Sequence, residues 1–155
     1  MNVFGRIAIV VKMYLDTCII AKLYLPEPES EAIQSLVTGV TDLTSSNLAV
    51  TELGSVLSRK NREGQIQSSV RDQIWDLFKG HIEENYWSFI SVSDELCRYS
   101  DEIIKKCQDV VSIRTLDAIH LATCLQYKIF PLLTTDKNML KAAQFLEIPL
   151  RSIPT

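Results

Sequence analysis

Two short apolar runs, each followed by an aspartate, constrain the fold of this chain more than any other feature. Residues 7–15 lead into Asp16, and residues 131–135 lead into Asp136. Short, almost continuous apolar runs are typical of strands buried on both faces, as in a parallel sheet. In an open α/β sheet, the residues just after the carboxyl ends of the strands meet in one crevice. The sequence therefore predicts that Asp16 and Asp136 lie near each other at one edge of a sheet.

Helical patterns alternate with strands along the rest of the chain. We expect further strands at residues 43–46, 87–92 and 150–153, and helices at residues 17–25, 31–38, 47–63, 68–84, 95–107, 115–127 and 137–146. Thr17 is the expected N-cap of the first helix. The apolar stripes predict that Val70, Leu77 and Leu116 face the core. Repeated strand–helix units predict an α/β fold, a three-layer sandwich with a central, mostly parallel sheet flanked by helices.

The composition is that of a soluble globular domain. The chain has 155 residues, of which 46% are apolar and 23% charged, enough for a full core in one domain. No apolar run is long enough to span a membrane, and no signal peptide is expected at the start. The four cysteines form no C-x-x-C pair. We therefore expect buried free thiols, a cytoplasmic location and no zinc site.

The charge of the chain limits its possible partners. A net charge of −3 disfavours a broad nucleic-acid footprint. Basic residues are nevertheless clustered at residues 59–62 and at Lys105 and Lys106. An acidic site with local basic patches indicates an enzyme that meets a phosphate backbone through a metal rather than a histone-like binder.

Two further acidic side chains stand among apolar neighbours. Glu52 lies in a helical pattern beside Leu53, and Asp117 lies in the segment Leu-Asp-Ala-Ile-His-Leu-Ala at residues 116–122. Carboxylates that lose hydration close to one another are costly without a cation or a shared proton. Mg²⁺ and Mn²⁺ prefer carboxylate and water oxygens, and such ions bind a phosphate oxygen and lower the pKa of a bound water. We expect His120 to be a hydrogen-bonded packing residue rather than a ligand.

Four segments of the chain carry a more specific signal. They are MYLDTCIIAKLY (13–24), SSNLAVTEL (45–53), RTLDAIHLA (114–122) and LTTDKNML (133–140). In this order and at these intervals they resemble the motifs of the PIN domain, the nuclease fold of VapC-type toxins. The resemblance implies metal-binding and catalytic roles for Asp16, Glu52, Asp117 and Asp136. It also matches Thr17 and Thr134 to hydroxyl positions of the family, while Asn138 stands where an acidic residue often occurs.

The resemblance also implies what the chain does. It predicts a single PIN domain at residues 13–155, with residues 1–12 either an N-terminal extension or a longer first strand. The expected activity is Mg²⁺- or Mn²⁺-dependent endonucleolytic cleavage of RNA, in the toxin of a toxin–antitoxin pair. Arg114, one turn before Asp117, is expected to pair with a carboxylate or to reach a substrate phosphate. The expected partners are RNA, a cognate antitoxin and a second copy in a homodimer, with no membrane.

Two alternatives remain at this point. Another metal-dependent phosphohydrolase would use Asp16 as a nucleophile and would usually carry a second aspartate two residues later, where Cys18 stands. A non-catalytic RNA-binding PIN domain would have lost acidic residues, whereas this chain has all four. For the antitoxin, we expect an amphipathic segment to dock near Leu23, Tyr24 and Leu25.

Overall fold

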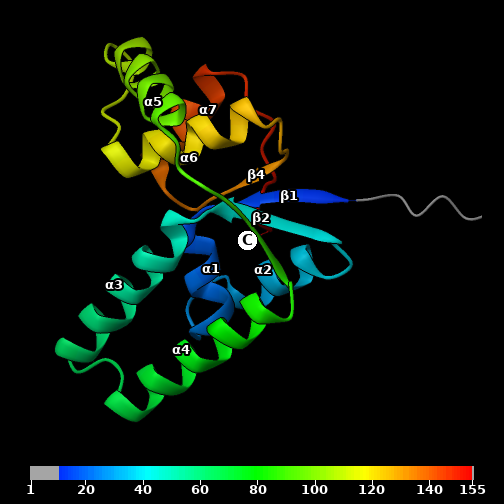
Figure 1. Ribbon diagram of the computed structural model, residues 1–155, viewed down its shortest axis with the longest axis vertical. Coiled ribbons are helices and arrows are strands. Elements are labelled where there is room, and N and C mark those ends of the chain that lie inside the picture. Colours follow the sequence, from blue (N-terminus) through cyan, green and yellow to red (C-terminus); the bar gives the residue numbers. More distant parts are fainter. Residues whose placement is uncertain (1–10, 155) are drawn as a thin grey trace, which may run out of the picture.

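The computed structural model describes residues 11–154, which form a parallel sheet of four strands with helices on both faces (Figure 1). The strand order is β3-β2-β1-β4, and each neighbouring pair is parallel. The predicted fold class is confirmed. Residues 1–10, and with them most of the predicted N-terminal extension or longer first strand, lie outside the described residues.

The elements follow the predicted order with small shifts at their ends. The strands are β1 (Lys12–Leu15), β2 (Asp42–Ser46), β3 (Trp87–Ile90) and β4 (Leu132–Leu133). The helices are α1 (Thr17–Tyr24), α2 (Ser30–Val37), α3 (Leu48–Arg62), α4 (Ser68–Glu83), α5 (Asp94–Cys107), α6 (Thr115–Gln126) and α7 (Lys137–Phe145). The predicted strand at 150–153 is reduced to a single parallel bridge between Leu132 and Leu150.

The sheet separates two apolar clusters. Helices α1–α4 cover one face and α5–α7 cover the other, as Figure 1 shows. Side chains of β1 alternate between the two faces, because Tyr14 belongs to the cluster under α5–α7 whereas Met13 and Leu15 belong to the other. This alternation places Tyr14 against α6, where it reaches the predicted site.

Several residues that were expected in the core are exposed. Leu77 is 52% exposed, Leu116 43% and Val70 38%, so these three predictions are wrong. Helical periodicity shows which residues share a face, but it does not show whether another element covers the whole of that face. On α4, Phe78 is the buried residue and the flanks of the apolar stripe remain open to solvent.

The start of α1 also differs from the prediction. Asp16 occupies the N-cap position, and Thr17 is the first helical residue. The Thr17 hydroxyl is therefore free to bond elsewhere.

None of the helices within residues 11–154 combines the length and the hydropathy that a membrane crossing requires.

Candidate active site

Asp16 and the segment after β4 meet at the carboxyl edge of the sheet. The Asp16 amide donates to the Leu133 carbonyl at 3.1 Å, which continues the pairing of β1 with β4. The Thr134 hydroxyl donates to Asp16 Oδ2 at 2.8 Å. Asp16 is buried. Asp16 therefore contacts the segment that leads into Asp136, as the strand-end argument predicted.

Asp136 has a structural role in addition to its place at this edge. Its Oδ1 accepts a hydrogen bond from the Met139 amide at 2.8 Å, which caps the N-terminus of α7. The Asp136 amide in turn donates to the Thr134 hydroxyl oxygen at 3.1 Å. Thr134 therefore connects the backbone at Asp136 to the carboxylate of Asp16.

Glu52, on α3, is held by two side chains from other elements. The Thr17 hydroxyl donates to Glu52 Oε2, and His120 Nε2 lies 2.8 Å from the same oxygen. Burial alone would raise the pKa of Glu52. The hydrogen bond and charge of His120 and the hydrogen bond of Thr17 outweigh burial and lower this pKa. Glu52 is thus held as an ionised carboxylate.

His120 links Glu52 to the sheet. It is buried on α6, and its Nδ1 lies 2.8 Å from the Tyr14 hydroxyl oxygen. Burial alone would lower the pKa of His120, but the bond to Glu52 and the charges of Asp16, Glu52 and Asp117 raise it. The prediction of a hydrogen-bonded packing residue is confirmed. Its connection to Glu52 carried no signal in the sequence, because the two residues are 68 positions apart.

The pKa of Asp117 reflects the negative charges at the carboxyl edge of the sheet. It lies in the first turn of α6 and is partly buried. Burial raises its pKa, and the negative charges of Asp16 and Asp136 raise it further. His120 and Arg114 act in the opposite direction with smaller effects. Arg114 itself is exposed and forms no ion pair within residues 11–154.

The four carboxylates fit a hard divalent cation in donor type and in charge. All are oxygen ligands, and the mutual repulsion that raises the pKa of Asp117 is the repulsion that a cation relieves. Among residues 11–154, no group of three or more His, Cys, Asp or Glu side chains is already arranged to hold a metal ion. One cluster of all four carboxylates therefore stays a prediction, and Glu52 points to Thr17 and His120 instead.

The comparison with known families decides the classification of the chain. The sequence model of the PIN domain matches residues 13–145. The chain belongs to the PIN domain family.

Individual relatives of this PIN domain are distant. Ribonuclease VapC3 of Pyrobaculum aerophilum is 30% identical over 79 residues, which cover 48% of this chain and 60% of the relative. The crystal structure of Mycobacterium tuberculosis VapC20, a sarcin–ricin loop cleaving toxin, matches with a TM-score of 0.66 at 16% identity, over 84% of this chain and 94% of that one. A toxin–antitoxin complex from Klebsiella pneumoniae matches with a TM-score of 0.54 at 19% identity, over 81% and 88%. At these identities the two structures support the fold.

Cys18 is a site residue of this PIN domain that the sequence analysis did not assign. Its thiol donates to Asp16 Oδ2 at 3.0 Å, and it accepts a hydrogen bond from the Thr135 hydroxyl at 3.3 Å. Burial and the nearby charge of Asp16 raise the pKa of the thiol to about 12. Cys18 is therefore a neutral donor that orients Asp16. Its position two residues after Asp16, in the first turn of α1, was the available signal.

The prediction that the four cysteines are buried free thiols is only partly confirmed. All four are free thiols, and Cys107 and Cys124 are buried, but Cys97 is exposed on α5.

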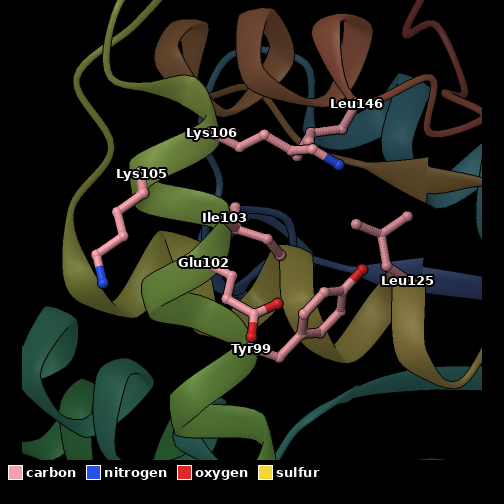
Figure 2. Close-up of a pocket in the computed structure, with 7 residues that line it drawn as sticks. All are labelled: Tyr99, Glu102, Ile103, Lys105, Lys106, Leu125 and Leu146. Carbon is pink, nitrogen blue, oxygen red and sulfur yellow. The ribbon is translucent and has the colours of Figure 1, made fainter.

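A separate hollow of the PIN domain lies at the other end of α6 from Asp117 (Figure 2). It has a volume of about 440 Å³ and is lined by Tyr99, Glu102, Ile103, Lys105, Lys106, Leu125 and Leu146. Leu125 is in the last turn of α6, whereas Asp117 is in its first turn. The hollow contains none of the predicted site residues, and Figure 2 shows it between α5, α6 and α7.

Proposed function

We propose that this chain is a metal-dependent endoribonuclease that uses the acidic edge of its sheet to cleave RNA. The observation that carries the proposal is the contact of Asp16 with the segment that leads into Asp136. The Thr134 hydroxyl donates to Asp16 Oδ2 and accepts from the Asp136 amide, and the charges of both aspartates raise the pKa of Asp117. Membership of the PIN domain family supports it over an aspartyl-phosphate phosphohydrolase. The presence of all four acidic residues supports it over a non-catalytic RNA-binding PIN domain.

Each of the four carboxylates would contribute oxygen ligands to Mg²⁺ or Mn²⁺. When bound, the ion supplies Lewis-acid chemistry for a phosphate oxygen and for water. Neighbouring residues orient the carboxylate of Asp16 and keep that of Glu52 ionised. Thr134 and Cys18 donate to one oxygen of Asp16 and fix its orientation. Thr17 and His120 keep Glu52 ionised, so that it can accept a proton or bind a cation.

RNA cleavage by the purified chain tests the proposal. A single-stranded RNA should be cut in the presence of Mg²⁺ or Mn²⁺ and remain intact in EDTA. Asp16→Asn should abolish cleavage without unfolding the chain, because removal of a like charge relieves repulsion. Asp109→Asn, which changes an exposed carboxylate outside the site, is the matched control and should retain activity. Full activity of Asp16→Asn would contradict the proposal.

We further propose that the chain is the toxin of a toxin–antitoxin pair and forms a homodimer. The similarity to VapC20 and to the Klebsiella pneumoniae complex supports the first part. A hollow of about 260 Å³ on the face covered by α1 and α4 offers an apolar surface for an antitoxin, lined by Leu23, Tyr24, Leu43, Leu77, His81, Tyr86 and Trp87. Leu25, which was expected on this surface, is buried and contributes to the core instead.

Expression in bacterial cells tests the toxin assignment. The wild-type chain should arrest growth, Asp16→Asn should not, and co-expression of the product of the neighbouring reading frame should restore growth. Growth that is unaffected by the wild-type chain would contradict the assignment. Sedimentation of the purified chain at micromolar concentration tests the homodimer, and a sample that remains monomeric would count against it.

A further inference from the structure

The last described segment of the chain extends the sheet toward the acidic edge. Leu150 bridges Leu132 in parallel, and the Arg151 amide donates to the Leu132 carbonyl at 3.0 Å. The residues after Leu150 therefore run in the same direction as β4. Since β4 ends at Leu133 and leads into Thr134, this segment approaches the edge where Asp16 lies.

A hollow of about 450 Å³ lies between this segment and α7. It is lined by Glu29, Thr134, Thr135, Lys137, Leu140, Gln144, Leu150, Arg151, Ser152, Ile153 and Pro154. Thr134 is both part of the wall and the donor to Asp16 Oδ2. The hollow therefore shares Thr134 with the surroundings of the predicted catalytic carboxylate. The volume falls within the range of roughly 300–1,000 Å³ that small-ligand sites occupy.

The charge of the hollow is positive although the chain as a whole is negative. Lys137 and Arg151 are exposed in its wall, and neither forms an ion pair within the described residues. The acidic residue of the wall, Glu29, is paired with Lys22 at 2.8 Å, which compensates its charge.

The remaining wall is suited to a base. Leu140, Leu150 and Ile153 are partly buried aliphatic residues that line one hollow. Gln144, Ser152 and Thr135 supply polar groups beside them. An aliphatic surface next to hydrogen-bonding groups and two cations matches the three parts of a nucleotide. Bases are available to such a surface where the RNA is unpaired, because in a duplex they are stacked and paired.

We propose that this hollow binds the nucleotide next to the cleaved bond of a single-stranded RNA. Lys137 and Arg151 bind a backbone phosphate, and the wall formed by Leu140, Leu150 and Ile153 receives the base. The proposal rests on the proposed function, since it takes the scissile phosphate to lie at Asp16. It identifies Lys137 and Arg151 as residues that bind the RNA beside the acidic edge.

Binding of a labelled single-stranded RNA oligonucleotide to the Asp16→Asn chain tests this subsite without any cleavage. In that background, Lys137→Glu combined with Arg151→Glu should weaken binding at least tenfold at 0.15 M salt. The slope of log affinity against log salt should fall by about 0.7 for each phosphate contact that is lost. Lys141→Glu is the control for Lys137→Glu, because it makes the same charge change as that single substitution, one turn along α7 at an exposed residue outside the hollow.

The outcomes separate this inference from the proposed function. If Lys141→Glu weakens binding as much as the paired substitution does, or if the Asp16→Asn chain binds no RNA, the subsite is wrong. If the paired substitution alone weakens binding but the wild-type chain cuts no RNA, the hollow stands as an RNA-binding site and the proposed nuclease activity falls, together with the placement of the hollow next to a cleaved bond. In the wild-type background, the paired substitution should raise KM more than it lowers kcat. Thermal unfolding of each variant near that of its parent shows that the fold is intact.

Discussion

Replacement of Tyr14 by phenylalanine removes one atom from the hydrogen-bonded chain that supports Glu52. The Tyr14 hydroxyl lies 2.8 Å from His120 Nδ1, and both residues are buried. The other ring nitrogen of His120 lies 2.8 Å from Glu52 Oε2. Tyr14→Phe keeps the ring in the core and leaves the ring nitrogen of His120 without its partner.

The size of the effect follows from burial. A buried polar atom that loses its partner costs about 1–3 kcal/mol, because water cannot replace the lost bond. His120 is 0% exposed, so water does not reach the nitrogen. We therefore expect the free energy of unfolding to fall by about 1–3 kcal/mol. For a chain of this length the melting temperature should fall by roughly 2–4 °C for each kcal/mol.

Urea unfolding of the wild-type chain, Tyr14→Phe and Tyr127→Phe measures this difference. Tyr127 is 47% exposed and its hydroxyl forms no hydrogen bond with residues 11–154, so its substitution controls for the loss of a hydroxyl at the surface. Tyr127→Phe should change the free energy of unfolding by less than about 0.5 kcal/mol. If Tyr14→Phe is no more destabilising than Tyr127→Phe, the hydrogen bond to His120 does not support the fold as argued.

Two further substitutions test other contacts. Thr134→Val removes the hydroxyl that donates to Asp16 but keeps a side chain of similar shape. It should lower the rate of RNA cleavage, and it should lower the free energy of unfolding by about 1.5–3 kcal/mol. Unchanged values in cleavage assays and in urea unfolding would refute the contact. Glu27 bonds Lys60 and lies near Lys22, and its hydrogen bond with Lys60, which outweighs partial burial, lowers the pKa of Glu27. A lowered carboxyl pKa contributes stability above the ordinary value of 4.5 and loses it as pH falls through the folded-state pKa. Glu27→Gln should therefore destabilise the chain at pH 7 by about 0.2–1 kcal/mol, and the difference from wild type should shrink in unfolding curves below pH 4.5; a difference that grows on acidification would contradict the pairing.

The position of the site could be predicted from the sequence because it depends on strand ends. An apolar run that ends in Asp16 and another that leads into Asp136 are enough to place both residues at one edge, once the strands are parallel and adjacent. The resemblance to the PIN domain motifs singled out Thr134, whose hydroxyl does contact Asp16. Local patterns and the handed connections of α/β folds determine these features.

Contacts between distant side chains could not be predicted in the same way. The bond between Tyr14 and His120 spans 106 positions, and it depends on how α6 packs on the sheet. Leu116 fits the apolar stripe of its helix, yet it is exposed because coverage depends on neighbouring elements. Arg151 and Lys137 likewise carried no signal as a pair, since the bridge at Leu150 brings their segments together only in the folded chain.

The most direct test of the account is the binding of Mn²⁺ to the purified chain, measured by electron paramagnetic resonance of the free ion. The account predicts that the wild-type chain binds Mn²⁺ and that Asp16→Asn and Asp117→Asn each weaken binding at least tenfold, about 1.4 kcal/mol. The control Asp109→Asn should bind as the wild type does. Equal binding by all four proteins, or no binding by the wild-type chain, would contradict the claim that the acidic edge of the sheet is a divalent metal site.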